Sequence, residues 1–109
     1  MVIGGYGFFG RRLVALLCRR PGLHVLVAGR DVEAAQALVQ QWQPQACATL
    51  QACRLDIGAP GWAADLQSWQ PQVVVHTAGP FQGQDYRVAE ACIAAGAHYV
   101  DLADGRAFV

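Results

Sequence analysis

The sequence predicts an α/β domain: a three-layer, doubly wound parallel sheet with helices on both faces. Three observations support this fold class. Apolar strand-like runs alternate with helix-like stretches along the chain, glycines cluster directly after the first apolar run, and 54% of the 109 residues are hydrophobic. That fraction slightly exceeds the usual value and suits a sheet that is buried on both faces. The length allows one core, so residues 1–109 are expected to form a single domain.

The first half of the chain contains three strand-like runs and two helix-like stretches. Residues 9–20 place leucines at helical spacing and end before Pro21-Gly22, which stops a helix. Asp31 is the expected N-cap of a second helix, which ends near Trp42. The predicted strands are 1–4, the short run MVIG; 23–29, an apolar run with β-branched residues; and 48–56.

The second half continues the alternation. A helix is expected to start near Pro60, and another covers 82–95 and ends at Gly96. The residues expected to face the core are Trp62, Leu66 and Trp69 on the first of these helices, and Val88, Ala91, Cys92 and Ala95 on the second. The predicted strands are 72–79 and 98–104. Because crossovers between parallel strands are right-handed, the strand order 3-2-1-4-5 is favoured.

Composition excludes several kinds of chemistry. All eight cationic side chains are arginine, so a Walker-type phosphate lysine, a Schiff-base lysine and a Tyr/Lys reductase pair cannot be built from this chain. The formal net charge is zero, which gives no argument for nucleic acid or a membrane surface as a partner. No apolar run approaches the roughly 18 residues of a membrane span, so neither a span nor a signal peptide is expected.

The four cysteines are expected to be free buried thiols in a reducing cytoplasm. They form no CxxC pair, and Cys18 and Cys92 fall at apolar positions of predicted helices. A disulfide or a metal site is the weaker alternative. We therefore expect a cytoplasmic protein without a metal ligand set.

Glycines at positions 4–10 form a phosphate-binding pattern. Gly4, Gly7 and Gly10 fit GxxGxxG, and Gly5 with the last two fits GxGxxG. The pattern follows an apolar run and opens a helix in an alternating βα chain, which is the context of a dinucleotide site. Such a site needs a tight turn, a bare backbone against the pyrophosphate and close packing at the last glycine, while the helix N-terminus supplies N–H groups. The alternative is a glycine-rich turn without a ligand.

The residue after the second predicted strand favours NADP over NAD. NAD sites usually place an acidic residue there to hold the ribose 2′-hydroxyl, whereas this strand ends in VAGRD and offers Arg30. A guanidinium suits a 2′-phosphate. Asp31 could bind the ribose instead, but helix capping is its stronger role. For Arg11, contact with that phosphate and exposure to solvent are about equally expected. For Arg12, exposure to solvent is the stronger alternative.

The carboxyl ends of the later strands give further candidates but no catalytic assignment. Asp56 follows the third strand, where it would either contact the adenine edge or cap the next helix. The residues expected at the crevice near the fourth and fifth strands are His76, Thr77, Phe81 and either Asp101 or Asp104. General acid–base catalysis by these residues is one interpretation. The stronger interpretation is that His76 is a buried histidine with satisfied hydrogen bonds and that Asp104 is a helix cap.

With these motifs in place, the sequence resembles the N-terminal NADP-binding domain of the saccharopine dehydrogenase-like oxidoreductases. The resemblance covers essentially the whole chain and is carried by GGYGFFGRRLV, VLVAGRD, LDI, GRAFV and above all VVVHTAGPFQGQDYRVAEACIAAGAHYVDLAD. It implies a Rossmann domain in which Gly4, Gly7, Gly10, Arg30 and the turn 78–81 contact the cofactor. Most members have Asn or Cys at the position of His76, so no role is carried over to that residue.

The motifs and the resemblance together give one set of candidate cofactor-binding residues. They are Gly4, Gly5, Tyr6, Gly7, Phe8, Phe9, Gly10, Arg11, Arg30, Asp56, Ile57, Ala78, Gly79, Pro80 and Phe81. Catalytic residues stay unassigned. The function that follows is the cofactor half of an NADP-dependent oxidoreductase, in which the nicotinamide carries hydride transfer.

The resemblance also implies partners. Family members join this domain to a second α/β domain that binds a small-molecule substrate and often forms a homodimer. The short first strand and the end at GRAFV, where a new helix pattern starts, indicate a fragment without that domain. The isolated chain is then expected to bind NADP(H) without turnover. The alternatives are an atypical short-chain reductase or epimerase-like protein, and a non-catalytic nucleotide sensor.

Overall fold

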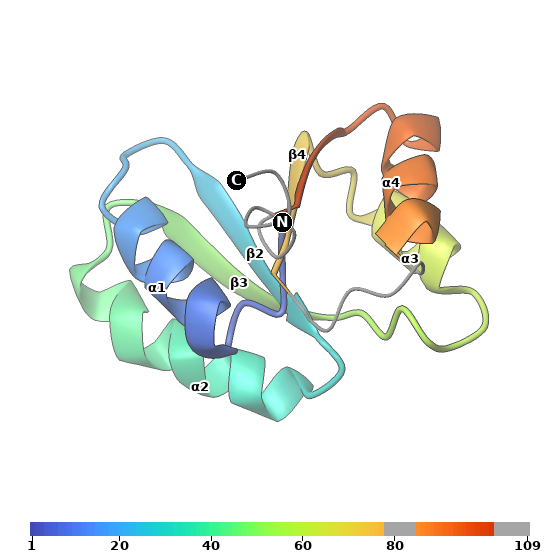
Figure 1. Cartoon of the computed structure of the whole chain (residues 1–109). Helices are drawn as coiled ribbons and strands as arrows, with labels where there is room; N and C mark the ends of the chain where they lie inside the picture. Colours follow the sequence, from blue (N-terminus) through green and yellow to red (C-terminus); the bar gives the residue numbers. More distant parts are fainter. Residues whose placement is uncertain (78–84, 102–109) are drawn as a thin grey trace, which may run out of the picture.

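The computed structural model describes residues 1–77 and 85–101, which form one parallel sheet with helices on both faces (Figure 1). The strands are β1 (Val2–Ile3), β2 (His24–Gly29), β3 (Thr49–Arg54), β4 (Val73–His76) and β5 (His98–Asp101). The helices are α1 (Phe8–Leu17), α2 (Val32–Trp42), α3 (Trp62–Ser68) and α4 (Asp85–Ala94), and a 3₁₀ turn, η1 (Gln43–Gln45), follows α2. The strand order is β3-β2-β1-β4-β5, so the predicted fold class and order are confirmed.

The two faces of the sheet carry separate apolar clusters. Helices α1 and α2 lie on one face, and α3 and α4 lie on the other (Figure 1). Side chains of β2 alternate between them: Val27 packs on the α1/α2 side, whereas Leu26 packs on the α3/α4 side. Leu66 of α3 is fully buried, with Trp62 and Trp69 packed against its cluster, as the helical spacing predicts. Full burial of one such side chain stabilises the fold by about 1.5–3 kcal/mol.

The central strand is the shortest one. Val2 of β1 lies in register with Val27 on one side and with Val75 on the other, so two residues connect both halves of the sheet. The strand ends at Ile3 because Gly4 has a φ of +79°, a left-handed conformation that a strand cannot continue.

Helix α1 ends earlier than the sequence pattern predicts. The expected helix 9–20 is observed as Phe8–Leu17, with Cys18 as its C-cap. The carbonyl oxygen of Cys18 accepts hydrogen bonds from the N–H groups of Cys47 and Ala48, at 2.7 and 3.0 Å, instead of continuing the helix. A contact distant in sequence therefore ends the helix, and Arg19 and Arg20 lie in the turn that follows.

Two predicted helix caps, Asp31 and Gly96, are confirmed. Asp31 caps α2, because its Oδ1 accepts hydrogen bonds from the N–H groups of Glu33 and Ala34, both at 3.1 Å. Gly96 ends α4 with a φ of +77°. The N–H groups of Gly96 and Ala97 donate back into the last turn of α4, at 3.0 and 2.8 Å, which is a Schellman motif.

Strand bounds and one cysteine differ from expectation. The predicted strands 23–29 and 48–56 are each shorter in the structure, and positions 78–79, 82–84 and 102–104 of other predicted elements lie outside the described residues. Cys18, Cys53 and Cys92 are buried free thiols, but burial is wrong for Cys47, which is exposed between η1 and β3. Burial raises the pKa of the Cys53 thiol to about 11, so it stays protonated at neutral pH. None of the helices within 1–77 and 85–101 has the length and apolar character needed to cross a bilayer.

Candidate functional site

A tight glycine turn connects β1 to α1. The N–H of Gly7 donates to the carbonyl oxygen of Gly4 at 2.9 Å, which closes the turn that the motif predicts. The positive φ of Gly4 makes this turn strained for any residue with a side chain. The turn therefore presents main chain, with few side-chain atoms, at the carboxyl end of the central strand.

The last glycine allows the helix to pack against the turn. A Cβ atom at Gly10 would lie far inside van der Waals contact with the carbonyl oxygen of Gly4 and 2.7 Å from the Cα of Gly5. Both obstacles are backbone atoms, which cannot rotate away. The expected close packing at Gly10 is thus present, and it places the first turn of α1 directly beside the glycine turn.

Both neighbouring strands hold this turn in place. The carbonyl oxygen of Ala28, in β2, accepts hydrogen bonds from Gly4 N–H at 2.8 Å and from Gly5 N–H at 3.4 Å. On the other side, Thr77 Oγ1 donates to the carbonyl oxygens of Ile3 and Gly4, at 2.8 and 3.2 Å. The sequence places Thr77 near the crevice but gives no role for its hydroxyl. The structure shows that it holds the glycine turn from the position directly after β4.

The N-terminus of α1 is suited to a negatively charged ligand. Its N-cap, Gly7, contributes no side chain, and its first turn contains no acidic residue. The first N–H groups of an α-helix lack intrahelical partners, and the helix dipole adds positive potential there. Phe9 is 64% exposed, and Arg11 and Arg12 are also exposed on this first stretch of the helix. Backbone and side chains thus contribute positive potential at the same place.

The turn after β2 lies on the same rim of the sheet. Ile3 of β1 is in register with Ala28 of β2, so Arg30 follows the strand end that adjoins the glycine turn. Arg30 is exposed. The adjacent Asp31 uses Oδ1 to cap α2, which supports the capping role over the ribose-binding one. The structure therefore brings the glycine pattern and Arg30 together.

Tyr6 joins the two turns. Its side chain reaches from the glycine turn to the end of β2, where its hydroxyl oxygen accepts a hydrogen bond from Asp31 N–H at 3.0 Å. A Cβ at Gly29 would lie 2.6 Å from that oxygen, so the ring occupies the space that a side chain at position 29 would need. The sequence marks Tyr6 only as a member of the glycine motif. The glycine immediately before Arg30 is the one signal that could have revealed this contact.

Asp56 and Ile57 lie one strand further out. Asp56 Oδ1 accepts a hydrogen bond from Gly58 N–H at 2.9 Å, which closes a local turn after β3. It does not cap α3, because the N-cap of that helix is Gly61. The alternative capping role is therefore wrong. The Asp56 carboxylate instead stabilises the turn that directly follows it. Ile57 is partly buried and packs against the α3/α4 cluster.

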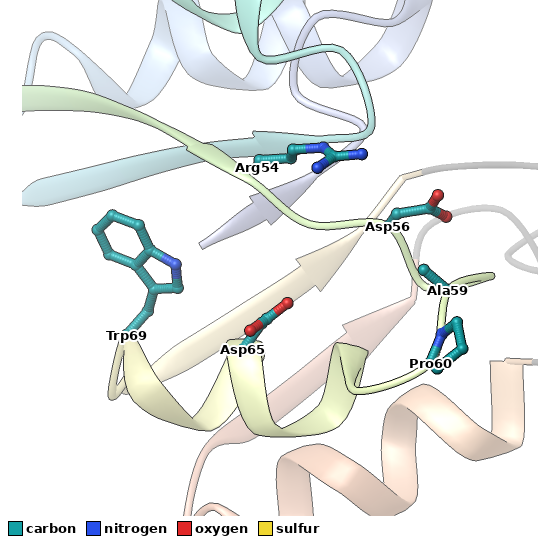
Figure 2. A pocket seen from close by; sticks show the side chains of 6 residues that line it. All are labelled: Arg54, Asp56, Ala59, Pro60, Asp65 and Trp69. Carbon is teal, nitrogen blue, oxygen red and sulfur yellow. The ribbon is translucent and has the colours of Figure 1, made fainter.

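A hollow of about 320 Å³ opens beside Asp56. Its lining consists of Arg54, Asp56, Ala59, Pro60, Asp65 and Trp69. Figure 2 shows that these side chains come from β3, from α3 and from the loop between them. The glycine turn contributes nothing to this lining, so the hollow is separate from the rim formed by the ends of β1 and β2.

His76 is a buried strand residue with a hydrogen-bonding partner. It is 2% exposed, and its Nδ1 lies 3.0 Å from the hydroxyl oxygen of Tyr99 on β5. This supports the interpretation of His76 as a core histidine that has a hydrogen-bonding partner at Nδ1. Asp101 ends β5 in register with His76. The candidates Ala78, Gly79, Pro80 and Phe81, as well as Asp104, lie outside the described residues.

Comparison with known proteins agrees with this geometry. A family model described as "saccharopine dehydrogenase NADP binding domain" matches residues 1–108. Among solved structures, the fold is similar to the bulky-bulky ketone specific alcohol dehydrogenase from Comamonas testosteroni in a tetragonal and an orthorhombic crystal form. Each match has a TM-score of 0.72 at 14% identity, covers 87% of this chain and covers 48% or 47% of the other. The chain thus spans about half the length of these structures. A comparison with curated proteins finds no match.

Proposed function

The chain belongs to the family of saccharopine dehydrogenase NADP-binding domains, and on this premise we propose that it orients NADP(H) for hydride transfer. The pyrophosphate would lie against the glycine turn and the N-terminus of α1. The adenosine 2′-phosphate would lie at Arg30. When bound, the nicotinamide supplies the hydride chemistry. The chain's own residues bind and orient the cofactor.

One observation carries this proposal. The glycine turn is held between β2 and β4 by Ala28 and Thr77, and the absence of a Cβ at Gly10 lets α1 start directly beside it. A cradle of this kind suits a diphosphate, because main-chain N–H groups and the helix dipole approach it without side chains between. The residues present therefore fit the cofactor that the family binds.

The preference for NADP is proposed to come from the turn after β2. Arg30 is exposed there, and a guanidinium can form two charge-assisted hydrogen bonds with a phosphate. Asp31, the residue that would favour the ribose 2′-hydroxyl of NAD, has its Oδ1 engaged in capping α2. This supports a capping role for Asp31 and leaves the phosphate contact to Arg30.

The reaction is proposed for the longer protein rather than for this half. A small-molecule substrate would be bound by a second domain, which would also provide the contact of a homodimer. In the hollow, rim and sheet described above, no residue is proposed as a catalytic acid or base. His76 is buried and bonded to Tyr99, and the Cys53 thiol is protonated at neutral pH because burial raises its pKa.

Calorimetric titration with NADPH and NADH tests the binding step. Wild-type chain is expected to bind NADPH at least about tenfold more tightly than NADH, because a hydrogen bond to a charged group contributes about 1.5–3 kcal/mol. Arg30→Gln is expected to weaken NADPH about 10- to 100-fold and leave NADH nearly unchanged. Arg20→Gln is the matched control, since Arg20 is also exposed but precedes the opposite end of β2. Equal or tighter binding of NADH by the wild type would overturn the proposal.

A further inference from the structure

The position of the Tyr6 hydroxyl group suggests a second recognition element beside Arg30. The hydroxyl lies 3.0 Å from the main-chain nitrogen of Asp31, the residue that directly follows Arg30. It comes from the glycine turn, whereas Arg30 comes from the end of β2. Two polar groups from different elements therefore lie on one rim of the sheet.

The hydrogen-bonding capacity of Tyr6 is only partly used. A phenol has one hydrogen to donate and two lone pairs that accept. Here one lone pair accepts from Asp31 N–H. Within residues 1–77 and 85–101, no acceptor for the hydroxyl hydrogen is found. The phenol can therefore donate to a ligand without giving up the contact that orients it.

The surroundings of the ring hold the hydroxyl in place. The space above Gly29 is filled by the Tyr6 ring, since a Cβ there would lie 2.7 Å from the ring carbon Cζ. Gly29 itself is fixed by a hydrogen bond from Leu55 N–H to its carbonyl oxygen, at 2.9 Å. Asp31 is fixed by its own capping bonds to Glu33 and Ala34. The backbone is thus fixed on both sides of Arg30, and it orients the Tyr6 hydroxyl. This preorganisation lowers the entropy cost of a hydrogen bond from that hydroxyl to a ligand.

We propose that Tyr6 is a specificity-determining residue whose hydroxyl donates a hydrogen bond to the 2′-phosphate of the bound cofactor, beside the Arg30 guanidinium. This inference rests on the proposed function, because it needs the 2′-phosphate to lie at the end of β2. A hydroxyl donor and a guanidinium would together recognise the phosphate from two directions. Tyr6 would then contribute to the choice of cofactor as well as to the glycine turn.

Two adenosine ligands isolate this contact. Adenosine 2′,5′-bisphosphate and adenosine 5′-monophosphate differ only in the 2′-phosphate, and both can be titrated calorimetrically into the 109-residue chain. The substitution Tyr6→Phe keeps the ring over Gly29 and removes only the hydroxyl. It is expected to weaken binding of the bisphosphate about 10- to 100-fold, as for one hydrogen bond to a charged acceptor, and to leave binding of the monophosphate unchanged.

Two further variants complete the experiment. Tyr99→Phe removes a phenol hydroxyl that contacts His76 on the α3/α4 side, so it should leave the ratio of the two affinities unchanged. Gly29→Ala displaces the Tyr6 ring without altering Tyr6, because the obstacle to the new methyl group is the far end of that side chain. It is expected to lower the ratio as Tyr6→Phe does. Thermal unfolding of each variant verifies that it is folded.

The outcomes separate this inference from the function on which it rests. If the wild type prefers the bisphosphate and Tyr6→Phe keeps the same preference, Tyr6 has no such role, while the proposed function stands. An equal loss for both ligands would also overturn the inference, since it would indicate a general effect on the glycine turn. If the wild type itself shows no preference, the 2′-phosphate site is absent and both proposals fail.

Discussion

Helices α1 and α2 begin on the same rim of the sheet but in opposite ways. The N-cap of α1 is Gly7, and no acidic residue lies in its first turn. The N-cap of α2 is Asp31, whose carboxylate accepts two main-chain hydrogen bonds, and Glu33 stands in its first turn. The N-cap of α2 thus carries a negative charge, whereas the N-cap of α1 is an uncharged glycine.

This difference shows where an external anion would be bound. A carboxylate already compensates the partial positive charge at the start of α2, so a phosphate there would gain little from the dipole. At the start of α1 the same potential has no carboxylate from its own cap. In the proposed function the two neighbouring turns have different roles. The first would bind the pyrophosphate, whereas the second stabilises α2 and presents Arg30 at its edge.

The largest effect is expected when α1 can no longer pack closely against the glycine turn. Gly10→Ala places a methyl group against backbone atoms of Gly4 and Gly5, which can be relieved only by moving the helix. We expect the free energy of unfolding to fall by about 3 kcal/mol and binding of both NADPH and NADH to be lost. Chemical denaturation and calorimetry measure the two effects.

The control for that variant is Gly22→Ala, in the turn before β2. Gly22 has a positive φ, +84°, unlike Gly10, and open space surrounds the position of its Cβ. It should cost only about 1 kcal/mol from backbone conformation and leave cofactor binding intact. Similar losses of binding in the two variants would contradict the special role of the turn at α1.

Removing the carboxylate tests the other half of the comparison. Asp31→Ala deletes the cap of α2 and is expected to reduce the free energy of unfolding by about 1 kcal/mol. The ratio of NADPH to NADH affinity should not change, because Asp31 serves the helix rather than the ribose. Asp31→Asn, which can still cap, should recover most of the stability. A selective loss of NADH binding would show that Asp31 holds the ribose.

Thr77→Val separates support of the glycine turn from contact with the ligand. The variant keeps the shape of the side chain but loses the hydroxyl that donates to Ile3 and Gly4. We expect a decrease of about 1 kcal/mol in the free energy of unfolding and the same loss of affinity, about 2- to 5-fold, for NADPH and NADH. Thr49→Val, at the exposed start of β3, is the matched control. Selective weakening of NADPH alone would contradict a supporting role.

The smallest expected effect concerns Arg11, which directly follows Gly10. Its side chain is exposed, so its attraction to a bound diphosphate is screened by solvent and salt. Arg11→Gln should weaken both cofactors by no more than about threefold. The loss should vanish at high salt in a titration series. A tenfold loss for NADPH alone would place Arg11 at the 2′-phosphate with Arg30.

Local signals predict most of this fold. Asp31 and the Gly96 motif set the ends of α2 and α4 from within a few residues of sequence, and both are found as predicted. The end of α1 is not local, because it depends on the contact of Cys18 with Cys47 and Ala48. No pattern within the helix itself carries that information, so the predicted helix is too long.

The same distinction applies to the candidate site. Glycine spacing and the arginine after the second strand are visible in sequence, and the structure places them on one rim. The contacts of Tyr6 with Asp31 and of Thr77 with Gly4 join residues that follow different strands. They follow from the register of β1 between its neighbours, which sequence periodicity does not specify. Hydroxyl groups in particular have no spacing rule that would reveal their partners.

The two-residue length of β1 has a consequence for how the chain folds. β2 pairs with β3 and β4 pairs with β5, but only Val2 and Ile3 join these two pairs into one sheet. The contact between Thr77 and Ile3 spans 74 residues, so closing it costs about 1 kcal/mol more chain entropy than forming either pair. Joining β1 to β4 is therefore expected to be the last of these pairings. The rim proposed to bind the cofactor would then form only when the two pairs of strands have met.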